Sequence, residues 1–412
     1  MSTNIHQWRG LQNVWPCHRE TVQKFLSKLD LHSLEGIASE ARNGISCKLL
    51  ANHFTTGRER IVFQIVFSDG VTWIARISLP PLSATPDDDT LVPVPGREVL
   101  LSEIITLRYL ARKTSLPLPS VHVYDLEPSN PLGAAYQLMT QMNGKLIRPY
   151  SVTPVTDIPH IYGQRADIVL TLSKLTFDKI GFLSGENEPA VRECIFMDFS
   201  IHKAFTTASE YYTTRSEEVL EEKRREVPPN EDWIVFAWLF VESIPHFLIK
   251  ELNNGPFPLH HPDLHNSNLL YDENNVISAV LDWTAAGTFP WEIVMAPPFV
   301  LDAAHYPERR KMYIDIFEAK ELASTGSNRF ATFMRSPASE IIQLVNDNYS
   351  TCAKRFPVQQ AERLAKLVFG SSTNWEDVKQ RYKEHRDSTT SPEVVTARSL
   401  VDEGSDKGTV VQ

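Results

Sequence analysis

The segment HHPDLHNSNLL, residues 260 to 270, gathers three histidines, one aspartate and two asparagines. Within it, His261, Asp263 and Asn268 follow the spacing H-x-D-L-x-x-x-N, and Asp282 lies fourteen residues after Asn268 in LDW. Phosphoryl transfer needs a carboxylate that orients the acceptor hydroxyl and takes its proton. It also needs an amide oxygen and a second carboxylate that hold Mg²⁺ on the phosphates. This spacing supplies all three groups.

Two other interpretations of the segment stay open at this point. His261, Asp263 and His265 stand at alternate positions, and such nitrogen and oxygen ligands could bind zinc in a metal-dependent hydrolase. Against zinc, the chain has no HExxH motif and no second histidine cluster. Alternatively, Asp263 and Asn268 could only cap backbone groups in a polar turn, as such residues often do.

The elements around the segment decide whether its polar groups can meet. A helix predicted over 232–252 ends at NNGPFP, where Asn, Gly and Pro stop it. A hairpin then follows, with strands at 268–272 and 276–283 joined by the turn ENN. Because the segment enters one strand and Asp282 lies at the far end of its partner, we expect Asp263, Asn268 and Asp282 to converge.

The rest of the chain divides into a strand-rich part and a helical part. Residues 19–41 predict one or two short amphipathic helices. Hydrophobic patterning then predicts five strands and one helix, followed by a mainly helical region. The predicted strands are 46–54, 60–67, 71–79, 120–127 and 134–142, the helix among them is 97–113, and the later helices include 161–176, 308–323 and 359–369.

Composition limits the class of protein. The 412 residues include 41 Lys and Arg against 51 Asp and Glu, a formal net charge of −10, which disfavours nucleic acid and anionic membranes as partners. Four scattered cysteines form no CxxC pair, so we expect a reducing compartment. The first residues lack the apolar stretch of a signal peptide, and we therefore expect a cytoplasmic protein.

Over residues 45 to 370, the sequence resembles the aminoglycoside phosphotransferase family, particularly its fungal members. Most of the likeness lies in GPFPLHHPDLHNSNLLYDENNVISAVLDWTAAGTFP, residues 255–290. Supporting segments occur in the same order upstream, and they are GVTWIARIS (70–78), SEIITLRYLARKTSLPLPSVHVYDLE (102–127), NPLGAAYQLMTQMNGK (130–145) and LTFDKIGFL (175–183).

The resemblance implies a bilobal, protein-kinase-like α+β fold. Its expected parts are an N-terminal helical extension (1–43), a nucleotide-binding N-lobe (44–141), a C-lobe with the catalytic loop and substrate-binding helices (142–384) and a disordered tail (385–412). The implied activity moves the γ-phosphoryl group of ATP or GTP to a hydroxyl of a small-molecule acceptor, with Mg²⁺ as cofactor.

Residue roles carry over position by position. Asp263 matches the catalytic base, Asn268 and Asp282 match the Mg²⁺ ligands, and His261 matches the residue that braces the loop. Glu103 matches the glutamate that pairs with the phosphate-binding lysine.

Three nucleotide-binding positions follow from the same match. Arg76 occupies the position of that lysine, and 138–141, with Met139 and Gln141, matches the hinge that receives the purine. Gly57 matches the turn that covers the phosphates.

Departures from the family pattern leave a second hypothesis open. Arg76 replaces an ammonium with a planar guanidinium, and the phosphate-covering turn has Gly57 as its single glycine, although Arg58 and Arg60 could add charge. Thr284 follows LDW where relatives often carry glutamate. The alternative is therefore a kinase-like binding or scaffold protein with weak catalysis.

Overall fold

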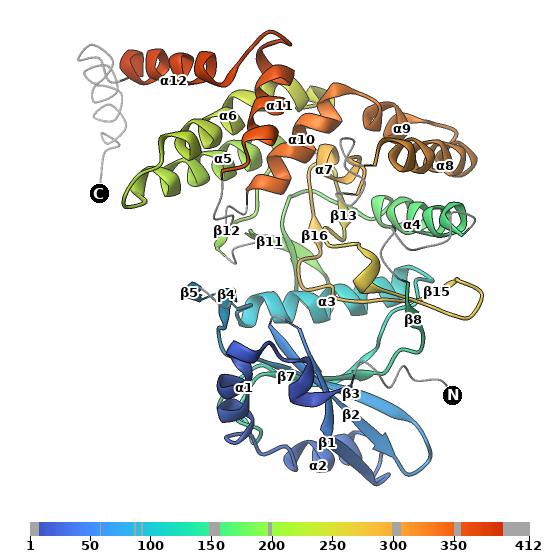
Figure 1. Ribbon diagram of the computed structural model, residues 1–412. Helices are drawn as coiled ribbons and strands as arrows, with labels where there is room; N and C mark the ends of the chain where they lie inside the picture. Colours follow the sequence, from blue (N-terminus) through green and yellow to red (C-terminus); the bar gives the residue numbers. More distant parts are fainter. Residues whose placement is uncertain are drawn as a thin grey trace, which may run out of the picture. The chain divides into compact units, whose positions relative to one another are not determined.

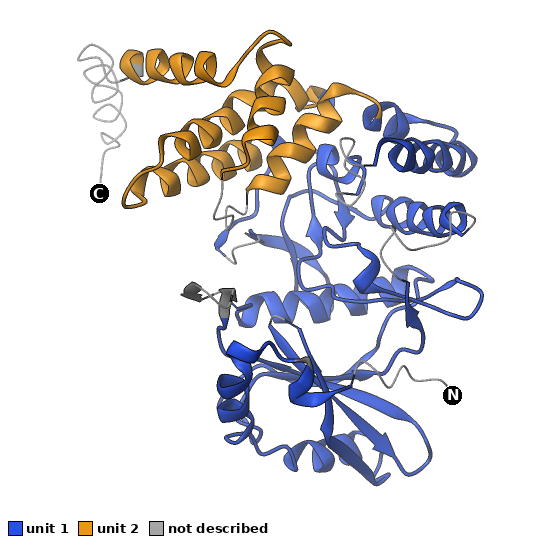
Figure 2. Ribbon diagram, in the orientation of Figure 1, with its two compact units in different colours: residues 1–208, 251–334 blue, residues 209–250, 335–412 orange. Residues whose placement is uncertain are grey.

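The computed structural model describes residues 8–57, 59–85, 88–91, 94–147, 157–196, 200–298, 306–349 and 356–389. The chain forms two compact units, each built from two stretches of sequence (Figure 2). Unit 1 comprises Met1–Ala208 and Glu251–Met334, and unit 2 comprises Ser209–Lys250 and Arg335–Gln412. All residues predicted to carry chemistry lie in unit 1.

Unit 1 contains a five-stranded antiparallel sheet with the order β1-β2-β3-β7-β6 (Figure 1). The five predicted strands are confirmed, with the bounds of β2 exact and the other ends shifted by one or two residues. Their bounds are β1 (Cys47–Thr56), β2 (Arg60–Phe67), β3 (Thr72–Ser78), β6 (Val121–Asp125) and β7 (Tyr136–Thr140). A short pair, β4 (Ser83–Thr85) and β5 (Asp88–Leu91), follows β3.

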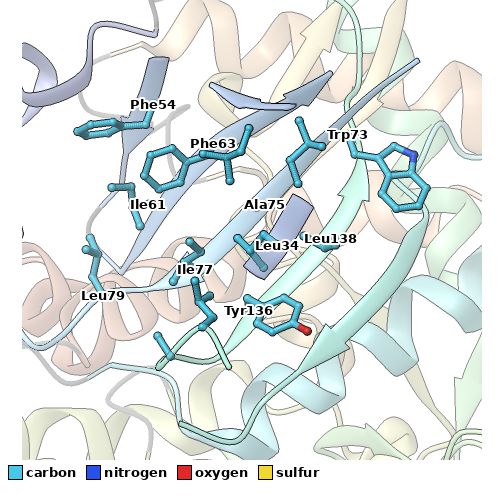
Figure 3. Close-up of a cluster of buried hydrophobic side chains, with 14 of the residues drawn as sticks. Leu34, Phe54, Ile61, Phe63, Trp73, Ala75, Ile77, Leu79, Tyr136 and Leu138 are labelled. Atoms are coloured by element: carbon cyan, nitrogen blue, oxygen red, sulfur yellow. The ribbon is translucent and has the colours of Figure 1, made fainter. Parts of the chain in front are cut away.

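One face of this sheet is a hydrophobic core. Alternate residues of β2, β3 and β7 are buried there, because successive side chains of a strand point to opposite faces. Figure 3 shows Phe63, Ala75 and Leu138 among them, together with Leu34 from a helix. The N-terminal helical segment therefore packs into the core of the sheet. Its elements are η2 (Gly10–Asn13), η3 (Pro16–His18), α1 (Arg19–Leu26) and α2 (Ser33–Ala41).

The helix α3 (Arg97–Lys113) has the predicted bounds and is buried along most of its length. Its residues Leu100 and Ile104 pack with Leu126, just after β6. Glu103, on the same helix, contacts Arg76 of β3 through an ion pair. Because Arg76 pairs across the strands with Val62 and Gln137, this contact belongs to the sheet face opposite the hydrophobic core.

The remaining elements of unit 1 hold the predicted catalytic segment. The hairpin is confirmed, and with β8 it forms a sheet with the order β15-β14-β8, while β13 lies between β16 and β9. The bounds are β8 (Lys145–Leu146), β9 (Thr176–Phe177), β10 (Phe182–Ser184), β11 (Ala190–Ile195), β12 (Ile201–Lys203), η4 (Lys250–Leu252), β13 (Phe257–His260), η5 (Asn266–Asn268), β14 (Leu269–Tyr271), β15 (Ile277–Val280) and β16 (Gly287–Thr288). The helices are α4 (Ile158–Ser173), α7 (Trp291–Val294), α8 (Pro307–Thr325) and α9 (Arg329–Met334).

Gly144 allows the chain after β7 to approach the hairpin closely. Its φ is +146°, and a Cβ atom there would lie 2.8 Å from Cβ of Leu270. Asn143 is held next to it, because its carbonyl accepts a 2.7 Å hydrogen bond from the Ser278 hydroxyl. The end of the five-stranded sheet and the hairpin are thus joined within unit 1, and the two compact units do not divide at the predicted lobe boundary of residue 142.

Unit 2 consists of helices around α6 (Glu231–Phe247). Phe236, Trp238 and Phe240 of α6 are buried. The helix ends at Phe247 rather than at residue 252, because Leu248 takes an extended backbone. The other helices are α5 (Ala208–Arg225), α10 (Pro337–Asn348), α11 (Val358–Phe369) and α12 (Trp375–Thr389).

The C-terminal boundary differs from the prediction of a disordered tail at 385–412. The helix α12 continues to Thr389, so residues 385–389 are helical, and residues 390–412 lie outside the described residues. Residues 385–389 are all polar, so they show no apolar spacing typical of a helix, and the sequence therefore did not predict the last turn of α12. Within the described parts of the chain, no helix combines the length and apolar character needed to cross a bilayer.

Candidate active site

His261 ties the loop after β13 to the strand that precedes Asp282. Its side chain is buried, and Nε2 lies 2.9 Å from the carbonyl oxygen of Leu281, to which it donates. Burial lowers the pKa of His261, so the ring is neutral with its proton on Nε2. The amide of Leu281 in turn donates to the Asn268 carbonyl at 2.8 Å. These two bonds fix the loop against the hairpin.

Asn268 and Asp263 are in direct contact. Nδ2 of Asn268 donates to both the carbonyl oxygen and Oδ2 of Asp263, each at 3.0 Å. Because the amide nitrogen is turned towards Asp263, the amide oxygen of Asn268 is presented on its other side. The Asp263 carboxylate is 41% exposed, so a solvent-borne hydroxyl can reach it.

Asp282 takes an unusual backbone conformation. Its φ is +60°, in the left-handed region that costs energy for most residues with a Cβ atom but is better tolerated by aspartate. Oδ1 accepts a 2.9 Å hydrogen bond from the Thr284 hydroxyl and lies 3.3 Å from Nη2 of Arg76. Burial raises the pKa of Asp282, but the Arg76 charge and the Thr284 hydrogen bond outweigh it and lower the pKa. The carboxylate is therefore anionic.

Arg76 and Glu103 form an ion pair beneath Asp282. Nη1 of Arg76 lies 2.5 Å from Oε1 of Glu103, whose side chain is fully buried. Burial lowers the pKa of Arg76, yet the charges of Glu103 and Asp282 more than compensate and raise it. The Thr284 hydroxyl also lies 3.2 Å from Oε2 of Glu103. Thr284 therefore joins the two carboxylates that contact Arg76.

The donor set suits a magnesium ion better than zinc. Within the described ranges, no group of three or more His, Cys, Asp and Glu side chains is arranged to hold a metal. Asn268 and Asp282 offer one amide oxygen and one carboxylate, and Mg²⁺ is commonly held by one or two such groups plus waters and substrate phosphates. Of the two ring nitrogens of His261, Nε2 already donates to the Leu281 carbonyl and so cannot bind zinc.

A family model described as the phosphotransferase enzyme family matches residues 54–291, more than half of the chain. The chain belongs to this family. The match contains every predicted site residue, from Gly57 to Asp282. Among curated proteins, a search found no match.

Comparison with solved structures found several similar chains of low sequence identity. A proposed fructosamine-3-kinase from Thermobifida fusca YX-ER1 is 14% identical, with a TM-score of 0.50, covering 82% of this chain and 99% of that one. The aminoglycoside phosphotransferase APH(4)-Ia is 16% identical, with a TM-score of 0.49, covering 83% and 99%. A proposed aminoglycoside phosphotransferase from Ralstonia eutropha JMP134 is 15% identical, with a TM-score of 0.48, covering 86% and 99%. The predicted kinase-like α+β fold is confirmed.

In this phosphotransferase, His265 has a closer link to Asp263 than the sequence indicated. Nδ1 of His265 accepts a 3.1 Å hydrogen bond from the Ser267 amide, which leaves the proton on Nε2. Nε2 lies 3.2 Å from Oδ1 of Asp263, and this contact raises the pKa of His265. Oδ1 and Oδ2 of Asp263 are therefore held by different donors, His265 and Asn268. In the sequence, only the alternate positions of Asp263 and His265 indicated a link between them, and that spacing was interpreted as a possible zinc site.

Buried Arg165 of α4 holds the loop between β13 and β14 through hydrogen-bonding contacts with it. Its guanidinium donates to the Leu264 carbonyl and lies 3.4 Å from Oδ1 of Asn266. Sequence analysis did not single out Arg165, because one arginine in a helical segment carries no pattern of its own.

The hinge and the phosphate-covering turn use several of their backbone groups internally. The Gln141 amide donates to the Thr72 carbonyl at 3.3 Å, and the Gln141 side chain accepts a bond from Gln64. The Gly57 amide donates to the Arg60 carbonyl at 2.9 Å. Met139 lies beside the ion pair, with Sδ 4.0 Å from Nη1 of Arg76. Arg58 lies outside the described residues.

Proposed function

We propose that the protein transfers the γ-phosphoryl group of ATP or GTP to a hydroxyl of a small molecule. Membership of the phosphotransferase enzyme family supports a kinase-type reaction. The observation that carries the proposal is one connected set of contacts. Asp263 is hydrogen-bonded to Asn268, and the Asn268 carbonyl accepts a bond from Leu281, the residue before Asp282. Asp282 contacts Arg76, which forms an ion pair with Glu103.

In this proposal, Asp263 accepts the proton of the acceptor hydroxyl. The hydroxyl oxygen forms a bond to the γ-phosphorus while the bond from that phosphorus to the bridging β-phosphate oxygen breaks, and the nucleoside diphosphate leaves. His265 and Asn268 orient the two oxygens of Asp263. His261 braces the loop.

Asn268 and Asp282 would hold Mg²⁺, which when bound neutralises charge on the phosphates. Arg76, positioned by Glu103, contacts the phosphate chain in place of the family's lysine. Met139 borders the purine, and the hinge 138–141 with Gln141 receives it, although the Gln141 amide already donates to the Thr72 carbonyl. Gly57 closes the turn beside the phosphates.

The acceptor is expected to be a small hydroxyl compound, and the net charge of −10 favours a cationic one. Aminoglycosides are the acceptors implied for some relatives by their designations, such as the hygromycin B complex of APH(4)-Ia. For this chain, the class of acceptor should be found by mass spectrometry of a metabolite extract incubated with protein and nucleotide, as a gain of one phosphoryl group.

Replacement of Asp263 tests the proposal most directly. Asp263→Asn keeps the shape of the side chain but removes its basicity, so turnover should fall by about 10² to 10⁴ while nucleotide affinity is kept. Coupled ADP or GDP release and nucleotide titration calorimetry measure the two quantities. Wild-type turnover in this variant would refute the role of Asp263.

A second candidate, a binding protein with weak catalysis, is favoured by the ion pair between Arg76 and Asp282, which occupies Oδ1 of a proposed metal ligand. It predicts nucleotide binding without phosphoryl transfer to any acceptor.

A further inference from the structure

Arg60, the first residue of β2, is a buried cation with an unmet hydrogen-bond donor. The residue is 7% exposed. Nη1 donates to the carbonyl oxygen of Glu59 at 3.3 Å, but for the buried Nη2 no hydrogen-bond partner lies among the described residues. A buried guanidinium normally has its donors paired, because an unmet donor in a dry environment is costly.

The register of the sheet places Arg60 beside Arg76. Val62 lies directly opposite Arg76, and Arg60 lies directly opposite Ser78, so Arg60 and Arg76 are diagonal neighbours on adjacent strands. Arg60 is two residues from Val62, so its side chain projects from the same face of the sheet as those of Val62 and Arg76. This is the face that carries Glu103 contacts and not the hydrophobic core.

The charges around Arg60 leave it poorly compensated. Glu103 and Asp282 both make their direct ion pairs with Arg76. Burial and the Arg76 charge lower the pKa of Arg60, and the more distant carboxylates of Glu103, Glu59 and Asp282 only partly oppose them. Two guanidinium groups thus lie on the same part of this face, and the carboxylates of Glu103 and Asp282 form their ion pairs with Arg76 and not with Arg60.

We propose that Arg60 and Arg76 form a two-arginine site for the phosphate chain of the nucleotide. Guanidinium groups bind phosphate oxygens through paired, charge-assisted hydrogen bonds, so an oxyanion here would satisfy Nη2 of Arg60. The site compensates for the turn before β2, where the Gly57 amide is already bonded to the Arg60 carbonyl. That the oxyanion belongs to a nucleotide rests on the function proposed above.

The test compares wild type with Arg60→Met by calorimetry in magnesium-free buffer containing EDTA. Tripolyphosphate probes the anion site alone, ADP probes the whole nucleotide site, and adenosine probes the base site without phosphate. Arg60→Met should weaken tripolyphosphate and ADP binding by about tenfold or more and leave adenosine binding unchanged. Arg97→Met is the matched control, because Arg97 is exposed and paired with Glu127, and its binding of all three probes should match wild type.

Thermal melting without ligand separates a binding role from a structural one. Removal of a poorly compensated buried charge should leave the melting temperature of Arg60→Met equal to or above that of wild type. If Arg60→Met does not fold, Arg60→Lys replaces it, with weakened tripolyphosphate binding as the expected result because the ammonium lacks the planar fork.

Three results would overturn the proposal. They are unchanged tripolyphosphate affinity in the Arg60 variant, a clear fall in its ligand-free melting temperature, or no tripolyphosphate binding by wild type. The proposed function fails separately. Suppose that wild type binds tripolyphosphate through Arg60, binds ADP no more tightly than tripolyphosphate and does not bind adenosine. The two-arginine anion site is then supported, and its assignment to a nucleotide is refuted.

Discussion

The two faces of the five-stranded sheet have different tasks although they are built from the same strands. On one face, Phe63, Ala75 and Leu138 are fully buried among apolar side chains (Figure 3). On the other, Arg60, Arg76 and Gln137 bring charge and hydrogen-bonding groups into a poorly solvated region. One residue of shift along a strand exchanges the faces, so each strand encodes stability and chemistry in alternate positions. Substitutions should therefore separate the two tasks cleanly.

A large effect on stability alone is expected from Phe63→Ala. Loss of this ring from the core should lower the free energy of unfolding by about 3–5 kcal/mol, through lost burial and the cavity left behind. Urea denaturation measures it. Val66→Ala on the same strand is the control, since Val66 is 36% exposed and its truncation should change the free energy by less than about 1 kcal/mol. Nucleotide affinity of folded Phe63→Ala should match wild type, and a loss of affinity would mean that the faces are coupled.

A smaller effect, on catalysis alone, is expected at His265. In His265→Asn, the side-chain oxygen can still accept the Ser267 amide bond, but the donor to Asp263 is lost. In His265→Gln, the amide nitrogen can reach Asp263 as Nε2 does. The turnover number should fall about tenfold in His265→Asn and much less in His265→Gln, with the nucleotide KM unchanged in both.

Steady-state kinetics of the two variants decide the matter. Equal losses in His265→Asn and His265→Gln would show that His265 only shapes the loop.

The smallest effect concerns the pH dependence of stability. The pKa of Asp282 is lowered in the folded protein, so its stabilising contribution is present above the unfolded value of about 3.9 and is lost as the pH falls through the folded value. Because the side chain is 46% exposed, this contribution should be below about 1 kcal/mol.

Asp282→Asn isolates the charge, since asparagine also tolerates the φ of +60°. The difference in unfolding free energy between wild type and Asp282→Asn should shrink as the pH is lowered from 6 towards 3. By contrast, the difference between wild type and Phe63→Ala should keep its size over that range. A pH-independent difference for Asp282→Asn would show that Arg76 does not stabilise the charged carboxylate.

Local patterns were enough for much of the fold. Runs rich in β-branched and aromatic residues predicted β2 and β3, and the helical spacing of Leu100, Ile104, Leu107 and Leu110 predicted α3 with its bounds. Short strands such as β13 and β16 escaped prediction, because two to four residues carry too little periodicity. Their pairing depends on contacts between Leu259 and Thr288, which are far apart in sequence.

The sequence by itself determined which residue types were available and which of them had to be neighbours along the chain. His261, Asp263, Asn268 and Asp282 were identified in this way, because their spacing reflects one loop and one hairpin.

Only the tertiary structure decided which partner each group takes. It turned His265 towards Asp263, added Asp282 to the Glu103 partner that the family resemblance implied for Arg76, and left Nη2 of Arg60 without a partner among the described residues. The physical reason is that hydrogen bonds and ion pairs are short-range and directional, and they depend on where separate elements bring side chains within about 3 Å of each other.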